Sequence, residues 1–348
     1  MQIGIGLDRG LGLTFAQERE LVREAAKLGY TSAWTNAGAG HGRDAFQVCA
    51  QWFGATEPLG DGIVTGISVV PVPTWHVATL ASVAGTVAEL TGGRFILGVG
   101  SGGIHSEAYR RSLGLTEQPP IALMRDYLIT LRRLLAGERV DHAGKSVKLQ
   151  GVGLGFSPPR VPLYLGALGE QMVRLAGEAA DGAALNWSTP EQVAWSRARV
   201  EEGARRAGRD PAEVQVVQYI RTCVDEDEEL ARRALGRAIL GYALARPGVS
   251  KQLGYRGHFA RMGFDEALTE LEARRDRGAS EAELAEAFPA ELLRKVGYYG
   301  PPEGAAAAFG RLAGGLDLAI VRVVPARPGP EAVAKVMRAC APEAVLAS

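Results

Sequence analysis

The feature that most constrains the fold is an alternation that repeats along the chain: a short apolar run, then a longer amphipathic helical pattern. Parallel strands joined by helical crossovers produce this order of segments. The predicted strands are Gln2–Leu7, Ser32–Thr35, Ile63–Val70, Phe95–Val99, Pro162–Gly166, Gly182–Trp187, Val214–Cys223 and Leu318–Pro325. Eight β/α units favour a TIM (β/α)8 barrel, and an open doubly wound sheet is the alternative because strand number alone does not show closure.

Two segments interrupt the alternation. Residues 137–150 contain GERVDHAGKSVKL, which predicts a β-hairpin with Ala143 and Gly144 near its turn. Residues 245–297 are charged and helical in pattern, and they lie between the seventh and eighth predicted strands. A long insertion there is more often a cap on the substrate side than an independent domain. We therefore expect one domain, residues 1–348, with two insertions.

The composition excludes several classes of partner. Lysine and arginine number 39, as do aspartate and glutamate, so no basic surplus indicates nucleic-acid binding. No apolar run is long enough to span a bilayer, and the first residues lack the features of a signal peptide. We expect a cytoplasmic protein without a membrane partner. The separated Cys49, Cys223 and Cys340 are predicted to be buried free thiols.

In a TIM barrel the chemistry takes place at the C-terminal ends of the strands. These positions are Asp8, Asn36, Val69 to Val72, Gly98 to Gly103, Gly166 to Gly169, Asn186 to Ser188, Arg221 to Cys223 and Pro325. They contain few carboxylates and histidines and no lysine, which argues against a catalytic metal and a Schiff base. Glycine and small polar groups instead suit a large organic cofactor that brings its own reactivity.

Two glycine-rich loops support this interpretation. One covers Gly98 to Gly103 after the fourth strand, and the other covers Gly166 to Gln171 and opens a helix. Amides at a helix N-terminus bind phosphate, although such glycines can also serve only tight turns. The first loop resembles a dinucleotide fingerprint, but it follows the wrong strand and lacks the acidic residue that should come later. Gly92 and Gly93 suit the left-handed end of a helix.

The stretch ELTGGRFILGVGSGG, residues 89–103, resembles the SGGRxxLGxGxG signature of the bacterial luciferase-like superfamily. The stretch RVPLYLGALGEQMVRLAGEAADGAALNW is similar to the branch that includes methylene-tetrahydromethanopterin reductase. The resemblance implies a TIM barrel that uses coenzyme F420, a deazaflavin, with FMN as the alternative, and we also expect a homodimer. The Glu-His pair of luciferases after strand two is absent. The Glu that follows GxG in the sugar-phosphate dehydrogenases is replaced by Gly103, so glucose 6-phosphate is a poor candidate substrate.

The resemblance also implies the cofactor-binding positions: Asn36, Ser68, Val69, Gly100, Ser101, Gly102, Gly166, Ala167, Leu168, Gly169, Glu170 and Gln171. The step from Ser68 to Val69 aligns with a non-proline cis peptide that forms a bulge behind the cofactor ring. We therefore expect a cis bond there.

Hydride transfer often needs a proton donor or acceptor near the ring. The predicted catalytic residues are His41, Asp44 and Glu107, although Asp44 could equally be the N-cap of the next helix. Three functions stay open: an F420-dependent oxidoreductase that transfers hydride between deazaflavin C5 and a small organic substrate, an FMN-dependent monooxygenase, and a non-catalytic cofactor-binding barrel. No metal site is expected.

Overall fold

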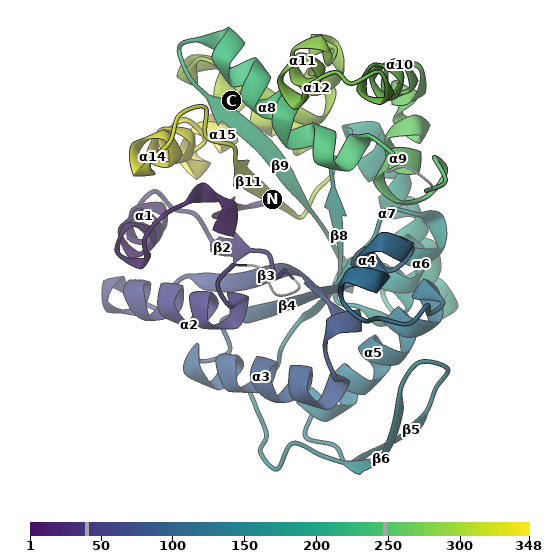
Figure 1. The fold of residues 1–348 in the computed structure, drawn as a ribbon. Helices are drawn as coiled ribbons and strands as arrows, with labels where there is room; N and C mark the ends of the chain where they lie inside the picture. Colours follow the sequence, from purple (N-terminus) through teal and green to yellow (C-terminus); the bar gives the residue numbers. More distant parts are fainter. Residues whose placement is uncertain (39–41, 246–248) are drawn as a thin grey trace.

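The computed structural model describes residues 1–38, 42–245 and 249–348, and eight parallel strands form a closed barrel surrounded by helices (Figure 1). The barrel strands are β1 (Gln2–Gly6), β2 (Ser32–Thr35), β3 (Val64–Pro71), β4 (Phe95–Gly100), β7 (Leu163–Gly166), β8 (Gly182–Asn186), β9 (Gln215–Val224) and β11 (Leu318–Val323). Strand β1 pairs with both β2 and β11, and β8 pairs with β9. These pairings close the sheet and confirm the TIM barrel.

Helices cover the outside of the barrel and fill the connections between its strands. They are α1 (Phe15–Lys27), α2 (Ala45–Thr56), α3 (Val77–Leu90), α4 (Glu107–Ser112), α5 (Pro120–Leu135), α6 (Glu170–Ala179), α7 (Pro190–Arg206), α8 (Glu228–Ala243), α13 (Ala305–Leu312), α14 (Pro330–Ala339) and α15 (Pro342–Ala347). Helix α3 ends at Leu90 with Thr91 as its C-cap, and Gly92 and Gly93 follow with positive φ, as predicted. No helix in the described part of the chain is both long and apolar enough to cross a membrane.

The two interrupting segments have different structures. Strands β5 (Val140–Ala143) and β6 (Lys148–Val152) form an antiparallel hairpin. The segment between β9 and β11 contains α9 (Gly254–Phe259), α10 (Asp265–Asp276), α11 (Glu281–Ala287) and α12 (Ala290–Val296), with a π-helical turn over Ala260–Phe264. Its apolar side chains form a second core with Trp187 and Cys223. These helices therefore pack on the ends of β8 and β9.

One strand was not predicted. Strand β10 (Gly297–Gly300) pairs in parallel with the last residues of β9, Arg221 to Val224. Strand β8 pairs with β9 only as far as Tyr219, so the rest of β9 offers β10 a free edge on that side, while its other edge pairs with β11. The four-residue sequence GYYG carries no alternation that could reveal this pairing. The predicted barrel strands differ from the observed ones by no more than two residues at either end.

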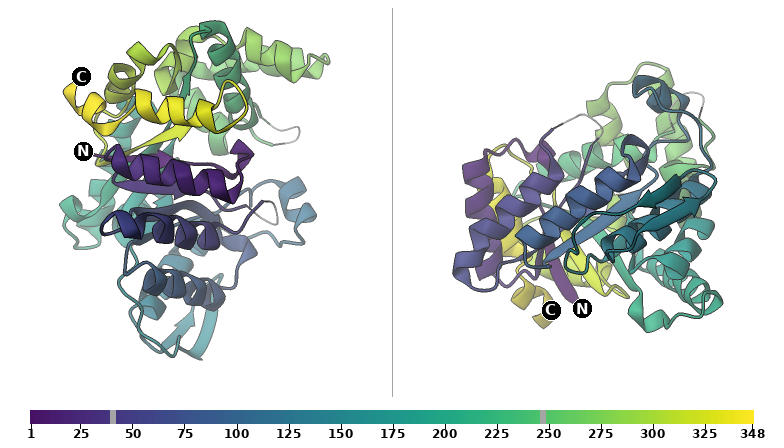
Figure 2. Two further views of the ribbon diagram at one scale, coloured as in Figure 1. Left: turned by 90° about the vertical axis from the view of Figure 1, so that its left-hand side faces the viewer. Right: turned by 90° about the horizontal axis from the view of Figure 1, so that it is seen from below.

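Aromatic and apolar side chains fill the lower part of the barrel. Trp34 and Tyr164 stack there with ring centroids 6.0 Å apart, beside Val217, Tyr219 and Ile320. The two chain termini lie close together on one side of the molecule (Figure 2), and all three cysteines are buried free thiols, as predicted. These side chains form the apolar floor of the barrel, and polar groups lie above it at the C-terminal ends of the strands.

Candidate active site

A bulge in β3 shapes one side of the barrel mouth. The peptide bond between Ser68 and Val69 is cis, which confirms the prediction. The register of β3 against β4 shifts between Ile67 and Val70. Both Ser68 and Val69 are half-buried, so the bulge presents part of its surface at the mouth.

The glycines of the neighbouring strands make room for this bulge. A Cβ atom at Gly98 would lie 2.3 Å from the carbonyl oxygen of Ile67, and one at Gly100 would lie 2.7 Å from Val69 Cγ2. A Cβ at Gly166 would lie 3.1 Å from Val69 Cγ1. Three adjacent strands therefore bring Val69, Gly100 and Gly166 together. Packing explains these glycines in part, and the cofactor contacts implied for them stay a prediction.

The loop before α6 is open in a different way. Gly169 is the N-cap of α6, and a Cβ placed there would have no neighbour within 4 Å. Glu170 and Gln171 are exposed, and Glu170 forms an ion pair with Arg174 at 2.7 Å. The first amides of a helix have no intrahelical acceptor, so they can donate to an anion. Arg261, from the insertion, donates to the carbonyl oxygen of Leu168 at 3.0 Å and places a cation beside this loop.

The remaining predicted cofactor positions lie near these two features. Ser101 is half-buried after β4, and Gly102 has φ of 58° with the Tyr109 hydroxyl 3.1 Å from its ideal Cβ position. Ala167 is buried directly after β7. Asn36 follows Thr35, which pairs with Ile67, so Asn36 lies at the level of Ser68 on the neighbouring strand.

Two buried arginines occupy the opposite side of the mouth. Arg322 on β11 forms an ion pair with Asp8, and its guanidinium lies 4.7 Å from the Tyr219 ring centroid. Arg221 on β9 donates to the Asn186 side-chain oxygen and lies 4.1 Å from the Trp187 ring centroid. Burial lowers the pKa of Arg322 to about 9 and also lowers the pKa of Arg221. Both pKa shifts show that these cations are poorly solvated.

Several buried polar atoms around the mouth lack a hydrogen-bond partner among the described residues. They are Asn36 Oδ1, Trp187 Nε1 and Arg322 Nη1, at the ends of β2, β8 and β11. Buried polar atoms in native proteins are normally hydrogen-bonded, so such atoms mark places where a ligand can complete the bonding. One acceptor and two donors on three strands suit a ligand with both carbonyl and N–H groups at its edge.

The predicted acid–base residues have other contacts. The Asp44 carboxylate accepts a hydrogen bond from the Gln47 amide at 2.9 Å and caps α2. Glu107 is exposed in the first turn of α4 and pairs with Arg111. His41 lies outside the described residues. A catalytic role for these three residues stays a prediction. Within residues 1–38, 42–245 and 249–348, no group of three His, Cys, Asp or Glu side chains could hold a metal ion.

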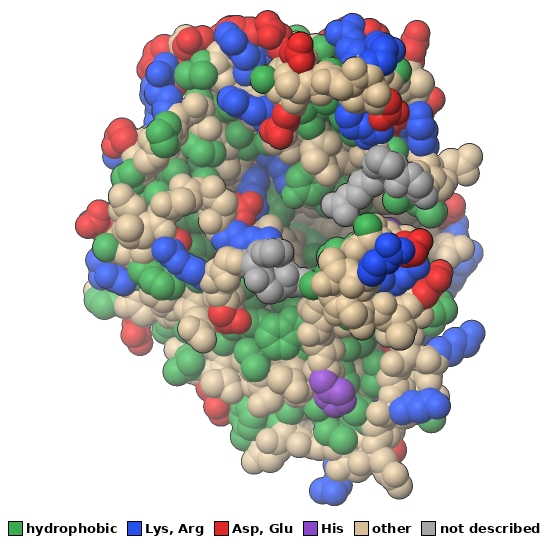
Figure 3. All heavy atoms as spheres, viewed as in Figure 1, with side chains coloured by type: hydrophobic (Ala, Val, Ile, Leu, Met, Phe, Trp, Pro, Cys, Tyr) green, Lys and Arg blue, Asp and Glu red, His purple; other side chains and the backbone are tan. Residues whose placement is uncertain are grey.

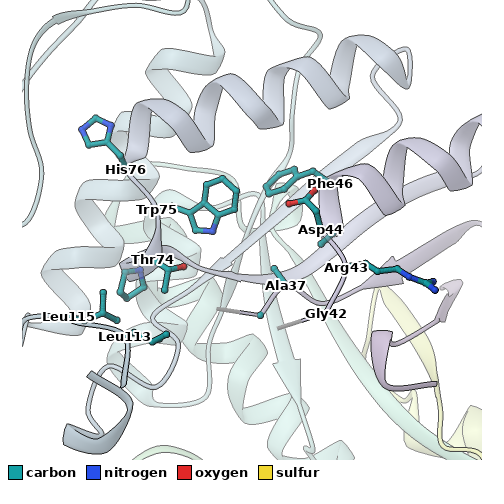
Figure 4. Close-up of a pocket in the computed structure, with 13 residues that line it drawn as sticks. Ala37, Gly42, Arg43, Asp44, Phe46, Thr74, Trp75, His76, Leu113 and Leu115 are labelled. Carbon is teal, nitrogen blue, oxygen red and sulfur yellow. The ribbon is translucent and has the colours of Figure 1, made fainter. Parts of the chain in front are cut away.

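A cavity of about 750 Å³ opens beside Asp44, between the β2–α2 loop and the β3–α3 loop (Figure 4). Phe46 and Trp75 face each other in it, with ring centroids 5.4 Å apart. Leu113 and Leu115 complete its apolar lining. Arg43 points away from the cavity in Figure 4, toward Glu18 at 2.7 Å. The cavity is therefore of mixed polarity: Asp44, Thr74 and His76 share its lining with the aromatic and leucine side chains.

The face of the molecule drawn in Figure 3 is hollowed at its centre, and Lys and Arg side chains lie in the hollow.

The model of one protein family, described as luciferase-like monooxygenase, matches residues 1–317. The chain belongs to this family. In this luciferase-like barrel, Gly98 and Gly100 of the motif over residues 89–103 lie against the β3 bulge.

Individual relatives of this luciferase-like protein include F420 enzymes. The chain is 32% identical over 190 residues to 5,10-methylenetetrahydromethanopterin reductase of Archaeoglobus fulgidus; the match covers 55% of this chain and 54% of that one. The chain thus spans about half the length of the curated relatives that it matches. The solved structure of the coenzyme F420 dependent tetrahydromethanopterin reductase of Methanopyrus kandleri has a TM-score of 0.76 at 22% identity, covering 98% of this chain and 99% of that one.

A second structure has the same fold. An F420-dependent secondary alcohol dehydrogenase, in complex with an F420-acetone adduct, gives a TM-score of 0.74 at 18% identity, covering 99% of this chain and 98% of that one. At these identities the two structures show a shared luciferase-like barrel fold.

Sequence reasoning assigned no role to the two arginines at the mouth of this luciferase-like barrel. Arg221 was noted only as a strand end, and Arg322 was not singled out. The sequence did contain a signal, because alternate residues of a strand point to the same side of the sheet. On each of these two strands, a charged residue follows apolar residues that point into the barrel. The residues are Val217, Tyr219 and Arg221 on β9, and Leu318, Ile320 and Arg322 on β11. A charge in that position of a buried strand indicates a functional group or a buried ion pair.

Proposed function

We propose that the protein is a coenzyme F420-dependent oxidoreductase that transfers hydride between C5 of the deazaflavin and a small organic substrate. The observation that carries this proposal is the packing of Val69 on Gly100 and Gly166, where the family resemblance implies that the cofactor ring binds. The similarity to a methylenetetrahydromethanopterin reductase and to F420-dependent glucose-6-phosphate dehydrogenases supports F420 in preference to FMN.

The residues at the mouth fit such a cofactor. Asn36 Oδ1 and Trp187 Nε1 are buried without a partner among the described residues, and the dione edge of a deazaflavin presents both N–H and carbonyl groups. The open helix start at Gly169, with Arg261 bound to Leu168, suits the phosphate of the cofactor side chain. We therefore assign ring contacts to the ends of β2, β3 and β8 and phosphate contacts to the loop before α6.

The chain's own residues would bind the cofactor, orient the substrate and move a proton. When bound, the deazaflavin supplies a carbon that accepts or donates hydride. Val69 would support one face of the ring, so that the substrate meets the other face. In the cavity beside them, the Phe46 and Trp75 rings would exclude water from part of the substrate. The candidates to move a proton are Asp44, which lines this cavity, together with His41 and Glu107.

The first test is to purify the protein from a host that makes F420 and to identify the chromophore that accompanies it. Reduced and oxidised F420 are then screened against enone, imine, alcohol and pterin substrates, with F420 oxidation state followed by absorbance. Turnover of F420 with any of these classes supports the proposal. Copurification of FMN with oxygen consumption would overturn it in favour of a monooxygenase, and cofactor binding without any turnover would indicate a non-catalytic barrel.

We also propose a homodimer, which light scattering would test. The cytoplasmic location is a further expectation, which localisation of the tagged protein in its host would test.

A further inference from the structure

The two buried arginines lie side by side in the barrel. Arg221 and Arg322 are directly paired in the register of β9 and β11, so their side chains leave the sheet on the same face. Each is only 4% exposed. The residues two positions earlier, Tyr219 and Ile320, belong to the apolar floor of the barrel. Both guanidinium groups therefore lie in the layer directly above that floor.

Their charges are not balanced by carboxylates. Arg322 forms an ion pair with Asp8, and no residue in the described part of the chain forms an ion pair with Arg221. The polar partners of Arg221 are neutral, namely the Asn186 side-chain oxygen and the Tyr242 side chain. The rings of Trp187 and Tyr242 lie 4.1 and 5.2 Å from its guanidinium carbon. Of the two buried cations, Arg322 has a carboxylate partner and Arg221 has none among the described residues.

Such an arrangement is costly unless an anion completes it. Buried charges in proteins are normally paired, and aromatic faces offset only part of the loss of water. Arg322 Nη1 is buried without a hydrogen-bond partner among the described residues, so at least one donor remains available. Guanidinium groups bind carboxylates through two parallel N–H donors. Lys and Arg side chains are visible in the central hollow of this face (Figure 3).

The position within the barrel indicates what the anion belongs to. Three strands separate β9 from β3 in each direction around the barrel, so Arg221 lies across the mouth from the Ser68–Val69 bulge. If the cofactor ring leans on that bulge, the arginines lie on the side that the substrate enters.

We propose that Arg221 and Arg322 form an anion seat that binds a carboxylate of the substrate, so that the physiological substrate is a small organic acid. That the bound carboxylate belongs to the substrate rests on the proposed oxidoreductase function. Anion binding by the two arginines can be tested without any cofactor.

The test uses benzoate as the probe and benzamide as its neutral isostere, each titrated into the full-length protein by calorimetry at low salt. We expect benzoate to bind at least about tenfold more tightly than benzamide, and Arg221→Gln to remove that difference. Arg237→Gln is the matched control, because it removes the same charge from an exposed position on α8. Equal affinity for benzoate and benzamide in the wild-type protein would overturn the proposal, whether or not any variant folds.

Two further experiments test the geometry of the guanidinium group and whether the anion belongs to the substrate or to the cofactor. Arg221→Lys keeps the charge but loses the planar fork, so benzoate affinity should fall between that of wild type and Arg221→Gln. With oxidised F420 bound, benzoate should still bind; competition between them would assign the seat to the cofactor and overturn the proposal. Absence of F420 binding with benzoate binding intact would contradict the proposed function and leave the anion seat standing.

Discussion

At the scale of single residues, the glycine-rich segments at the barrel mouth contain glycines with two distinct roles. Gly98 is required because any Cβ there would lie 2.3 Å from the main-chain oxygen of Ile67, which cannot move without disturbing β3. We expect Gly98→Ala to lower the free energy of unfolding by about 1–3 kcal/mol, the usual cost of overpacking. Urea unfolding measures this, with Gly169→Ala as the control in open space. Equal losses in both variants would contradict the packing role.

Gly169 illustrates the other role, which is access to the main chain. Its φ of −90° is allowed to any residue, and the position has open space around it. Gly169→Val should therefore cost only about 1 kcal/mol of stability, because valine is a poorer N-cap residue than glycine. The new side chain would nevertheless cover the amides that we assign to phosphate. F420 affinity, measured by fluorescence titration, should fall at least about tenfold, or about 1.4 kcal/mol. Unchanged affinity would show that the loop is only a turn.

At the scale of secondary-structure elements, the start of α2 tests the role of Asp44. The Asp44 carboxylate accepts from the Gln47 amide at 2.9 Å. Asp44→Ala should lower the free energy of unfolding by about 1 kcal/mol. Asp44→Ser should keep most of the wild-type stability, because serine is also a good N-cap residue. Chemical denaturation of both variants decides this. If Asp44→Ser keeps stability but loses all turnover, Asp44 is also catalytic.

Helix α9 makes the protein sensitive to acid. Its His258 is 1% exposed and contacts the Trp187 carbonyl oxygen at 3.1 Å and Ser188 Oγ at 3.3 Å. Burial, followed by the charge of Arg261, lowers the pKa of His258 from 6.5 to about 4. Below pH 6.5 the unfolded chain binds a proton that the folded protein does not bind. The histidine's contribution is therefore complete above pH 6.5 and is lost as the pH falls toward 4.

We expect the free energy of unfolding to fall by about 1.4 kcal/mol per pH unit across this window because of His258. Urea unfolding at several pH values measures the slope for the wild type and for His258→Gln. The variant is compared by its slope, since its absolute stability also changes. Parallel slopes in the two proteins would show that His258 is not the responsible group.

At the scale of the whole molecule, the fold was predictable because each barrel strand carries its own signal. Runs such as FILGV and AIVRV are short, apolar and followed by helical patterns, and this local information specifies the barrel. Strand β10 was missed because its pairing depends on how far β9 extends, which is a tertiary property.

The active site was predictable only where a motif spans it. The motif at residues 89–103 led to Gly100, the β3 step led to Val69, and the loop over Gly166 to Gln171 led to Gly166. The pairing of Arg221 with Arg322 depends on strands about 100 residues apart, and only the register of β9 and β11 brings the two together. The Asp44 contact is the N-cap alternative that the sequence analysis named, and the pair of Glu107 with Arg111 is a local contact within α4.

The central claim is that this luciferase-like barrel uses a deazaflavin. The most direct measurement is calorimetric titration of the purified protein, freed of any bound chromophore, with F420 and with FMN under the same conditions. We predict that F420 binds at least about tenfold more tightly, a difference of about 1.4 kcal/mol. Tighter binding of FMN than of F420 would contradict the account.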